Sequence, residues 1–225
     1  MIKLKNISKQ YSHKKVSKQL FSKLSLTIAD DTSVAVLGKN GSGKTSMLQI
    51  ISGVDKEYTG LVELSANRVG YVNQKPGEIL LPWFTVKKNI LLPREHAGLD
   101  IKKGERLLVK YADILNIDFS FEKYPYMLSG GQQQITSLLR ALLLEPELLI
   151  LDEPFSALDS SKRKLVKSFL TEYRCSCPLL LVSHRKEEYS QLADEAIILP
   201  DKYCEKVRRI NIENVEVSEA ILESS

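Results

Sequence analysis

The chain has 225 residues, of which 43% are hydrophobic and 27% are charged, and its formal net charge is +4. This length suits one domain with its own hydrophobic core, and the balance of residue types excludes a disordered or fibrous protein. The most apolar stretch, 141–151, is interrupted by Glu145, Pro146 and Glu147. A bilayer span needs roughly 20 apolar residues, so we expect any membrane role to come through a partner.

The N-terminal residues alternate between polar and apolar types, which is typical of a half-buried strand and not of a secretion signal. Segments 2–7, 24–28 and 61–64 share this alternation and predict a small antiparallel β layer. Seven lysines precede Asp30, the first acidic residue. We expect them on a solvated strand face, and we predict no nucleic-acid partner.

A strand expected over 33–37 leads into a glycine-rich segment and then into a helical pattern. The segment reads Gly38, Lys39, Asn40, Gly41, Ser42, Gly43, Lys44, Thr45 and Ser46. Strand, loop and helix in this order predict a P-loop, in which glycines let backbone N–H groups surround phosphates at a helix start. Lys44 supplies a positive charge to the phosphates and Thr45 a hydroxyl ligand for Mg²⁺. The loop alone does not choose among GTPases, kinases, helicases and other P-loop families.

Further short apolar runs at 69–72, 148–151, 179–182 and 196–199 alternate with helical patterns. This arrangement predicts a mostly parallel sheet covered on both faces, so the fold class is α/β. Between 85 and 144 the strand signals stop, and apolar residues at 107, 108, 111, 112 and 115 recur at helical spacing, which predicts an inserted helical lobe. A last strand is expected over 207–212, followed by segment 214–219, and we expect no second regulatory domain.

The cysteines Cys175, Cys177 and Cys204 form an odd set. Neither histidines nor further cysteines accompany them at the spacing of zinc ligands. We therefore interpret all three as reduced residues of a cytosolic protein, without a metal or redox role.

The strand expected over 148–151 ends in two neighbouring carboxylates, Asp152 and Glu153. At the mouth of a buried strand, Asp152 can hold the Mg²⁺ shell, while Glu153 can position or deprotonate an attacking water. Earlier in the chain, Leu128-Ser129-Gly130-Gly131-Gln132 opens a helical run that continues to Leu144.

The phosphate loop, this signature segment and the Asp-Glu pair together resemble the ATP-binding cassette (ABC) ATPases, in which they occur in the same order. The resemblance covers nearly the whole chain, from Tyr11 to His184. It implies a P-loop NTPase (RecA-like) core with a small antiparallel β layer and an inserted α-helical lobe. The cassette would be a single domain, with core residues 1–84, lobe residues 85–144 and core residues 145–225.

The resemblance also implies roles for single residues. Glu153 would be the catalytic base, Gln74 the Q-loop residue at Mg²⁺ or the water, and His184 the switch residue at the γ-phosphate. Asp159 would end the D-loop, reach the opposite subunit and also cap the following helix. The residues expected to bind ATP are Tyr11, which would stack on adenine, Gly38, Lys39, Asn40, Gly41, Ser42, Gly43, Lys44, Thr45, Ser46, Ser129, Gly130, Gly131, Gln132 and Asp159. Those expected at Mg²⁺ are Thr45, Gln74 and Asp152.

The signature segment opens a helix, so its N–H groups and helix dipole predict an anion site. In the ABC family this segment closes on the ATP bound to the other subunit. One phosphate loop and one signature per chain then imply two composite sites, in a homodimer or in a pair with a paralogous cassette chain.

The segment 80–90 reads Leu-Leu-Pro-Trp-Phe-Thr-Val-Lys-Lys-Asn-Ile and resembles the cassettes of nitrate, sulfonate and taurine importers. This implies integral membrane permease subunits, an extracytoplasmic solute-binding protein and a peripheral position on the cytoplasmic side of the inner membrane. Trp83 and Phe84 would lie beside the permease's coupling helix or pack the junction between lobes. The solute of such an importer would be small and anionic.

An exporter subunit and a soluble cassette protein are the alternatives. Repair cassettes need a long coiled coil between phosphate loop and signature, for which the 85 positions from Lys44 to Ser129 are too few. Translation cassettes carry two copies in one chain, and this chain carries one.

Overall fold

The computed structural model describes residues 1–13, 16–199 and 207–212. Their backbone forms two compact units. Unit 1 contains residues 1–67 together with the described residues from 178 onward, and unit 2 contains residues 68–177. Cys204 and the segment 214–219 lie outside the described residues.

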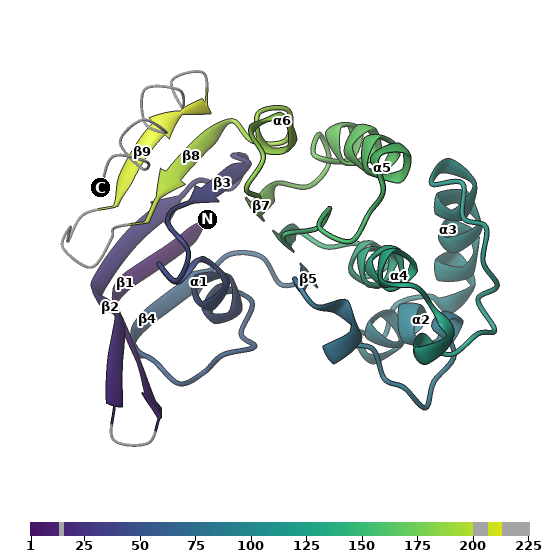
Figure 1. Cartoon of the computed structure of the whole chain (residues 1–225), viewed down its shortest axis with the longest axis horizontal. Helices are drawn as coiled ribbons and strands as arrows, with labels where there is room; N and C mark the ends of the chain where they lie inside the picture. Colours follow the sequence, from purple (N-terminus) through teal and green to yellow (C-terminus); the bar gives the residue numbers. More distant parts are fainter. Residues whose placement is uncertain (14–15, 200–206, 213–225) are drawn as a thin grey trace. The chain divides into compact units, whose positions relative to one another are not determined.

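The β layer of unit 1 is a three-stranded antiparallel sheet with the order β2-β1-β4. It consists of β1 (Ile2–His13), β2 (Val16–Ile28) and β4 (Thr59–Leu64). The predicted layer is confirmed, but its first two strands are longer than expected and form one extended hairpin (Figure 1). Pairing persists past Ile7 because backbone hydrogen bonding does not require the apolar alternation that marks the strand in the sequence.

The second sheet of unit 1 surrounds β3 (Val34–Leu37), which pairs in parallel with β7 (Leu179–Val182) and β8 (Glu195–Ile198). β9 (Arg208–Asn211) adds an antiparallel edge to β8. Every residue of β3 and β7 is buried, as continuous apolar strands of a covered parallel sheet require. The helices α1 (Lys44–Ile51) and α6 (Lys186–Tyr189) follow β3 and β7 along the chain.

Unit 2 contains a parallel strand pair and the predicted helices. The strands are β5 (Val69–Val72) and β6 (Leu148–Asp152). The helices between them are α2 (Val86–His96), α3 (Ile101–Ile114) and α4 (Gly130–Leu142), and α5 (Ser160–Tyr173) follows β6. The single turns η1 (Pro76–Glu78) and η2 (Pro125–Met127) complete the unit. The α/β class and the helical lobe are therefore confirmed.

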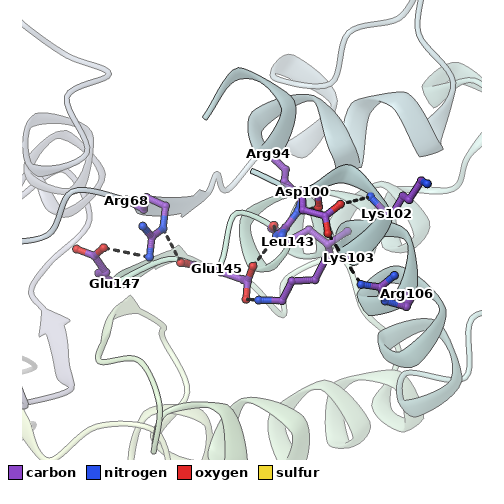
Figure 2. Close-up of polar contacts among 9 residues, drawn as sticks. All are labelled: Arg68, Arg94, Asp100, Lys102, Lys103, Arg106, Leu143, Glu145 and Glu147. Atoms are coloured by element: carbon purple, nitrogen blue, oxygen red, sulfur yellow. Dashed lines mark hydrogen bonds and ion pairs between the residues drawn. The ribbon is translucent and has the colours of Figure 1, made fainter. Parts of the chain in front are cut away.

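A buried arginine ties the helices of unit 2 together (Figure 2). Arg94 of α2 is 1% exposed, and its guanidinium donates to the Asp100 carbonyl (2.7 Å), the Leu143 carbonyl (2.8 Å) and the Glu145 carboxylate (2.7 Å). The hydrogen bond from Lys103 and then that from Arg94 hold the pKa of Glu145 below its usual value. The connection between α2 and α3 is thereby joined to the end of α4.

The same turn is linked to the strand pair. Arg68, immediately before β5, donates from Nε to the Glu145 carbonyl (3.0 Å) and forms an ion pair with Glu147 (3.1 Å), as Figure 2 shows. Within unit 2, the end of the α4 helix is thus anchored at the start of both strands. In the part of the chain that the structure describes, no helix combines the length and hydropathy needed to cross a membrane.

Candidate functional site

The loop after β3 depends on glycine. Gly38, Gly41 and Gly43 have φ angles of +148°, +79° and +99°, a region that side chains rarely tolerate. A Cβ atom on Gly43 would lie 2.6 Å from the ring of Phe21, so this backbone rests directly on the hairpin strand β2. The loop is therefore held in one shape by the β layer beneath it.

The first turn of α1 is built to receive an anion. Gly43 stands at its N-cap and provides no side-chain cap, and no acidic residue lies in the first turn. Lys44 is 9% exposed, and its ammonium donates to the Gly38 carbonyl (2.7 Å) and the Lys39 carbonyl (3.2 Å). Backbone N–H groups at a helix start, with a cation at their centre, are the arrangement that binds phosphate groups.

Tyr11 lies beside this loop. The first strand is predicted over 2–7, but β1 continues to His13, so Tyr11 is an internal strand residue paired with Lys18. Its hydroxyl is 3.1 Å from the Ser46 hydroxyl, and the side chain is 45% exposed. An exposed ring fixed to the first turn of α1 is a surface on which a planar group can stack.

His184 belongs to the same unit and follows β7. Partial burial and then the positive charge of Lys44 lower the pKa of its imidazole, while Glu188 acts in the opposite direction. The imidazole is therefore mainly neutral at pH 7. The loop that carries it is anchored by Ser183, whose hydroxyl donates to the buried carboxylate of Glu188 and accepts the Arg185 N–H (3.2 Å).

The remaining strand-end residues belong to unit 2. Asp152 ends β6 and is fully buried, and Glu153 next to it is 9% exposed with a left-handed φ of +50°. A non-glycine residue held in this region costs on the order of 1 kcal/mol, which is typical of functional turns. β5 and β6 are parallel, so Gln74, which follows β5, emerges at the same end of the pair. Its side chain is exposed.

The signature segment starts α4. Ser129 is the N-cap: its hydroxyl accepts the Gln132 N–H (3.3 Å), and the Gln132 side chain accepts the Ser129 N–H (3.1 Å). Gly131 packs on the predicted D-loop, since a Cβ there would be 3.0 Å from the Ala157 carbonyl. Asp159 caps α5 by accepting the Lys162 N–H at 2.8 Å, as the sequence predicts.

The predicted site residues thus fall into two sets. Unit 1 brings together Tyr11, the phosphate loop and His184, and unit 2 carries Gln74, the signature, Asp152, Glu153 and Asp159. Within the described residues, no three His, Cys, Asp or Glu side chains gather as metal ligands. The residues predicted to bind Mg²⁺ offer a hydroxyl, a carboxylate and an amide oxygen. Together with phosphate oxygens, these are ligands that Mg²⁺ accepts.

Sequence reasoning missed two residues of unit 1. Phe21 supports Gly43, and Lys9 is 3% exposed although it was expected on a solvated face with the other early lysines. That expectation is wrong for Lys9, because Lys9 shares the buried face of β1 with Ile7. In the sequence, the sign of this burial is that Lys9 follows the apolar Ile7 by two positions, which places both side chains on the same face of a strand.

A parallel sheet whose central strand ends in this loop defines a P-loop nucleotide-binding protein. The family described as ABC transporter matches residues 21–156. The chain belongs to this family, and it is an ATP-binding cassette that hydrolyses ATP.

Relatives and a solved structure agree with this placement. The probable sulfate/thiosulfate import ATP-binding protein CysA of Chlorella vulgaris is 34% identical over 215 residues, covering 88% of this chain and 86% of the relative. The aliphatic sulfonates import ATP-binding protein SsuB 2 of Frankia alni is 40% identical over 182 residues, covering 79% of this chain and 70% of the relative. A dimeric ATP-binding cassette in a post-hydrolysis state, bound to ADP and Pi, superposes with a TM-score of 0.82 at 25% identity, covering 94% of this chain and 99% of the other.

Proposed function

We propose that this chain is the ATP-hydrolysing subunit of a bacterial importer, and that closure of a cassette dimer on MgATP powers transport of a small anionic solute. The observation that carries the proposal is the uncapped start of α1, with Lys44 held among the loop carbonyls. The chain would act as one cassette, with core residues 1–84 and 145–225 and lobe residues 85–144.

In this proposal the phosphates of ATP lie on the loop 38–46, and Tyr11 stacks on the adenine. Thr45, Asp152 and Gln74 would hold Mg²⁺, because hydroxyl, carboxylate and amide oxygens are its preferred protein ligands. The metal would supply charge neutralisation at the phosphate oxygens. The positive charge of Lys44 attracts the same phosphates, and this attraction becomes stronger when water is excluded from the site.

Glu153 acts as the general base in the proposed reaction. Its left-handed backbone places it in the turn that follows a buried strand, where it is 9% exposed, and a carboxylate held at such a position can accept a proton from a water molecule. His184 would contact the γ-phosphate. A mainly neutral imidazole can donate one hydrogen bond to the phosphate while its other nitrogen accepts one.

A second cassette chain would complete each site. Ser129, Gly130 and Gln132 are accessible at the start of α4, and this start would receive the γ-phosphate held by the partner. One phosphate loop and one signature per chain then give two sites for two chains, in a homodimer or with a paralogous cassette. The dimeric state of the ADP-bound cassette that resembles this chain supports the arrangement.

An exposed aromatic surface on unit 2 would receive the permease. Trp83 is 66% exposed, Tyr126 67% and Met127 52%, so Trp83 is not buried in the packing of its unit. The turns η1 and η2 that neighbour these residues both lie next to the Gln133 side chain: a Cβ on Gly77 would be 2.9 Å from its Oε1, and its Nε2 donates to the Pro125 carbonyl (3.0 Å). Large exposed apolar side chains mark partner surfaces.

Import is favoured over export by the relatives, whose names describe import of sulfate, thiosulfate or sulfonates. Such a system would place the chain at the cytoplasmic side of the inner membrane, with an extracytoplasmic solute-binding protein as a further component. The cassette itself would not contact the solute.

Substitution of Glu153 by glutamine tests the reaction. We expect the ATPase rate to fall at least about 100-fold, because a general base is lost, while MgATP binding persists and the dimer accumulates. Steady-state phosphate release and light scattering after size exclusion measure the two effects. The matched control is Glu147→Gln, immediately before β6, which should keep the wild-type rate. A normal rate in Glu153→Gln would refute its role, and a monomer with MgATP would refute the dimer.

Isolation of the native assembly tests the transport role. Wild-type chain should co-purify with integral membrane proteins, and Trp83→Ala should reduce that association while leaving MgATP binding intact. Retention of the wild-type association by Trp83→Ala would exclude this surface from the contact.

A further inference from the structure

A buried lysine lies beneath the exposed ring of Tyr11. Lys9 is 3% exposed, and its Nζ is 4.7 Å from the centroid of the Tyr11 ring. The two residues are two positions apart on β1, and the ammonium lies over one face of the aromatic ring. An ammonium at this distance makes a cation–π contact, which is strongest where water is excluded.

Acidic side chains from another part of unit 1 hold the ammonium in place. The two carboxylate oxygens of Asp55 lie 3.0 and 2.9 Å from Lys9 Nζ, and a Glu57 oxygen lies at 3.8 Å. Asp55 is itself fixed, because its Oδ1 accepts the Glu57 N–H at 2.9 Å. The Lys9 side chain is 2% exposed, whereas the Glu57 side chain is 94% exposed, so Asp55 is the partner that balances the buried charge.

A second contact fixes the other end of the Tyr11 ring. Its hydroxyl is 3.1 Å from Ser46 Oγ, in the first turn of α1. The ring is therefore held at its hydroxyl by the helix that follows the phosphate loop and on one face by a buried cation. These two restraints set its orientation relative to the phosphate loop.

We propose that Lys9, clamped by Asp55, is a positioning residue for the nucleotide base, because it holds the Tyr11 ring so that its opposite face stacks on the purine. This inference rests on the proposed role of Tyr11 in the ATP site. Lys9 acts on the base only through the ring.

The electrostatics of stacked rings support this role. The faces of an aromatic ring carry partial negative charge, so two stacked π systems repel each other when their centres coincide. A cation under the far face of Tyr11 withdraws part of that charge. Stacking of a purine on the other face then becomes more favourable, and the ring loses less freedom when the base binds.

A double-mutant cycle with two ligands tests the proposal. Wild type, Lys9→Met, Tyr11→Ala and the double variant are compared by calorimetry with MgADP, and by competition with inorganic tripolyphosphate, which has no base. We expect Lys9→Met to weaken MgADP about fivefold to twentyfold, the size of a partly desolvated cation–π contact. Tripolyphosphate affinity should stay unchanged, and Lys9→Met should have no further effect in the Tyr11→Ala background.

Three more variants keep the outcome decisive. Lys9→Arg retains the cation and should recover most of the MgADP affinity. Asp55→Asn keeps the side-chain size and should weaken MgADP in the same direction, which decides the matter if Lys9→Met does not fold. Lys5→Met removes a lysine of the same strand that pairs with Glu63, and it should bind like wild type.

The results separate this inference from the proposed site. Loss of MgADP affinity in Tyr11→Ala but not in Lys9→Met or Asp55→Asn overturns the role of Lys9 alone. Equal weakening of MgADP and tripolyphosphate by Lys9→Met also overturns it, because the effect would then be on the loop and not on the base. Wild-type affinity in Tyr11→Ala overturns the assignment of the adenine site itself.

Discussion

The starts of α1 and α4 are similar in sequence and opposite in construction. Both are rich in glycine and serine, and they belong to different units. Before α1, Gly43 adopts a left-handed conformation and provides no side-chain hydrogen bond. Before α4, Ser129 is extended, with φ −64° and ψ +161°, and forms a capping box with Gln132.

This difference indicates which helix start can bind phosphate by itself. At α1 the N-cap residue Gly43 makes no side-chain cap hydrogen bond, and the buried Lys44 ammonium donates to the Gly38 carbonyl of the preceding loop. At α4, two N–H groups are already occupied by Ser129 and Gln132. A phosphate at α4 must compete with that box, so we expect this site to form only when a second chain brings a nucleotide to it.

The largest effect is expected from Gly43→Ala. The new Cβ would enter the Phe21 ring and the backbone would stay at φ +99°, so we expect a loss of about 2 kcal/mol or more in the free energy of unfolding and no measurable MgATP binding. Gly130→Ala is the comparison at α4, where the nearest atom is 3.8 Å away. In urea denaturation, Gly130→Ala should keep the wild-type midpoint. A similar loss of stability in both variants would contradict the proposed difference between the two helix starts.

Substitution of Lys44 by alanine comes next. We expect MgATP affinity to fall about 100-fold in calorimetry, because a charge-assisted contact to phosphate is lost at the uncapped start of α1. The fold should persist, and Lys5→Ala should bind as wild type does. Unchanged affinity in Lys44→Ala would exclude the loop as the phosphate site.

A smaller effect is expected from Ser129→Ala. Loss of the cap should lower the free energy of unfolding by about 1 kcal/mol while binding of MgATP to the single chain stays unchanged. Thr85→Ala removes a comparable cap, from the Lys88 N–H at the start of α2 (3.2 Å), and should cost the same stability. Only Ser129→Ala should also reduce the ATPase rate. Equal ATPase rates in Ser129→Ala and Thr85→Ala would show that the signature segment takes no part in the ATP site.

The smallest effect concerns the pKa of His184, which lies below its ordinary value of 6.5. The unfolded chain then binds a proton more readily, so this residue's contribution to stability falls as pH drops from about 6.5 through the folded pKa. Lys44→Ala should raise the pKa and Glu188→Gln should lower it further, as a histidine NMR titration would record. Shifts of the same sign in both variants would contradict the proximity of Lys44.

Local patterns predicted the centre of the fold well. Val69–Val72 and Leu179–Val182 match their predicted bounds, and β3 starts within one residue of its prediction, because continuous apolar runs ended by glycine or polar residues leave few alternatives. The phosphate loop was recognisable for the same reason, since its glycines determine the local backbone.

Contacts between distant segments were beyond this kind of reasoning. No residue near Lys9 in the sequence indicates that Asp55 is its partner. The lysine is buried only in the folded β layer, where the two side chains meet. The Ser-x-x-Gln spacing from Ser129 to Gln132 is itself the signal of a capping box, but the same segment also has the glycines of an anion site, and the sequence does not show that the box occupies two of its N–H groups.

The buried guanidinium of Arg94 has a consequence for how this chain can diverge. Gly104 lies inside α3, where glycine costs about 1 kcal/mol relative to alanine, yet a methyl group there would come within 2.6 Å of Arg94 Cδ. Substitutions at positions 94 and 104 are therefore coupled. Descendants of this sequence should either keep the arginine together with the glycine or exchange both, with a shorter side chain at 94 accompanying a bulkier one at 104.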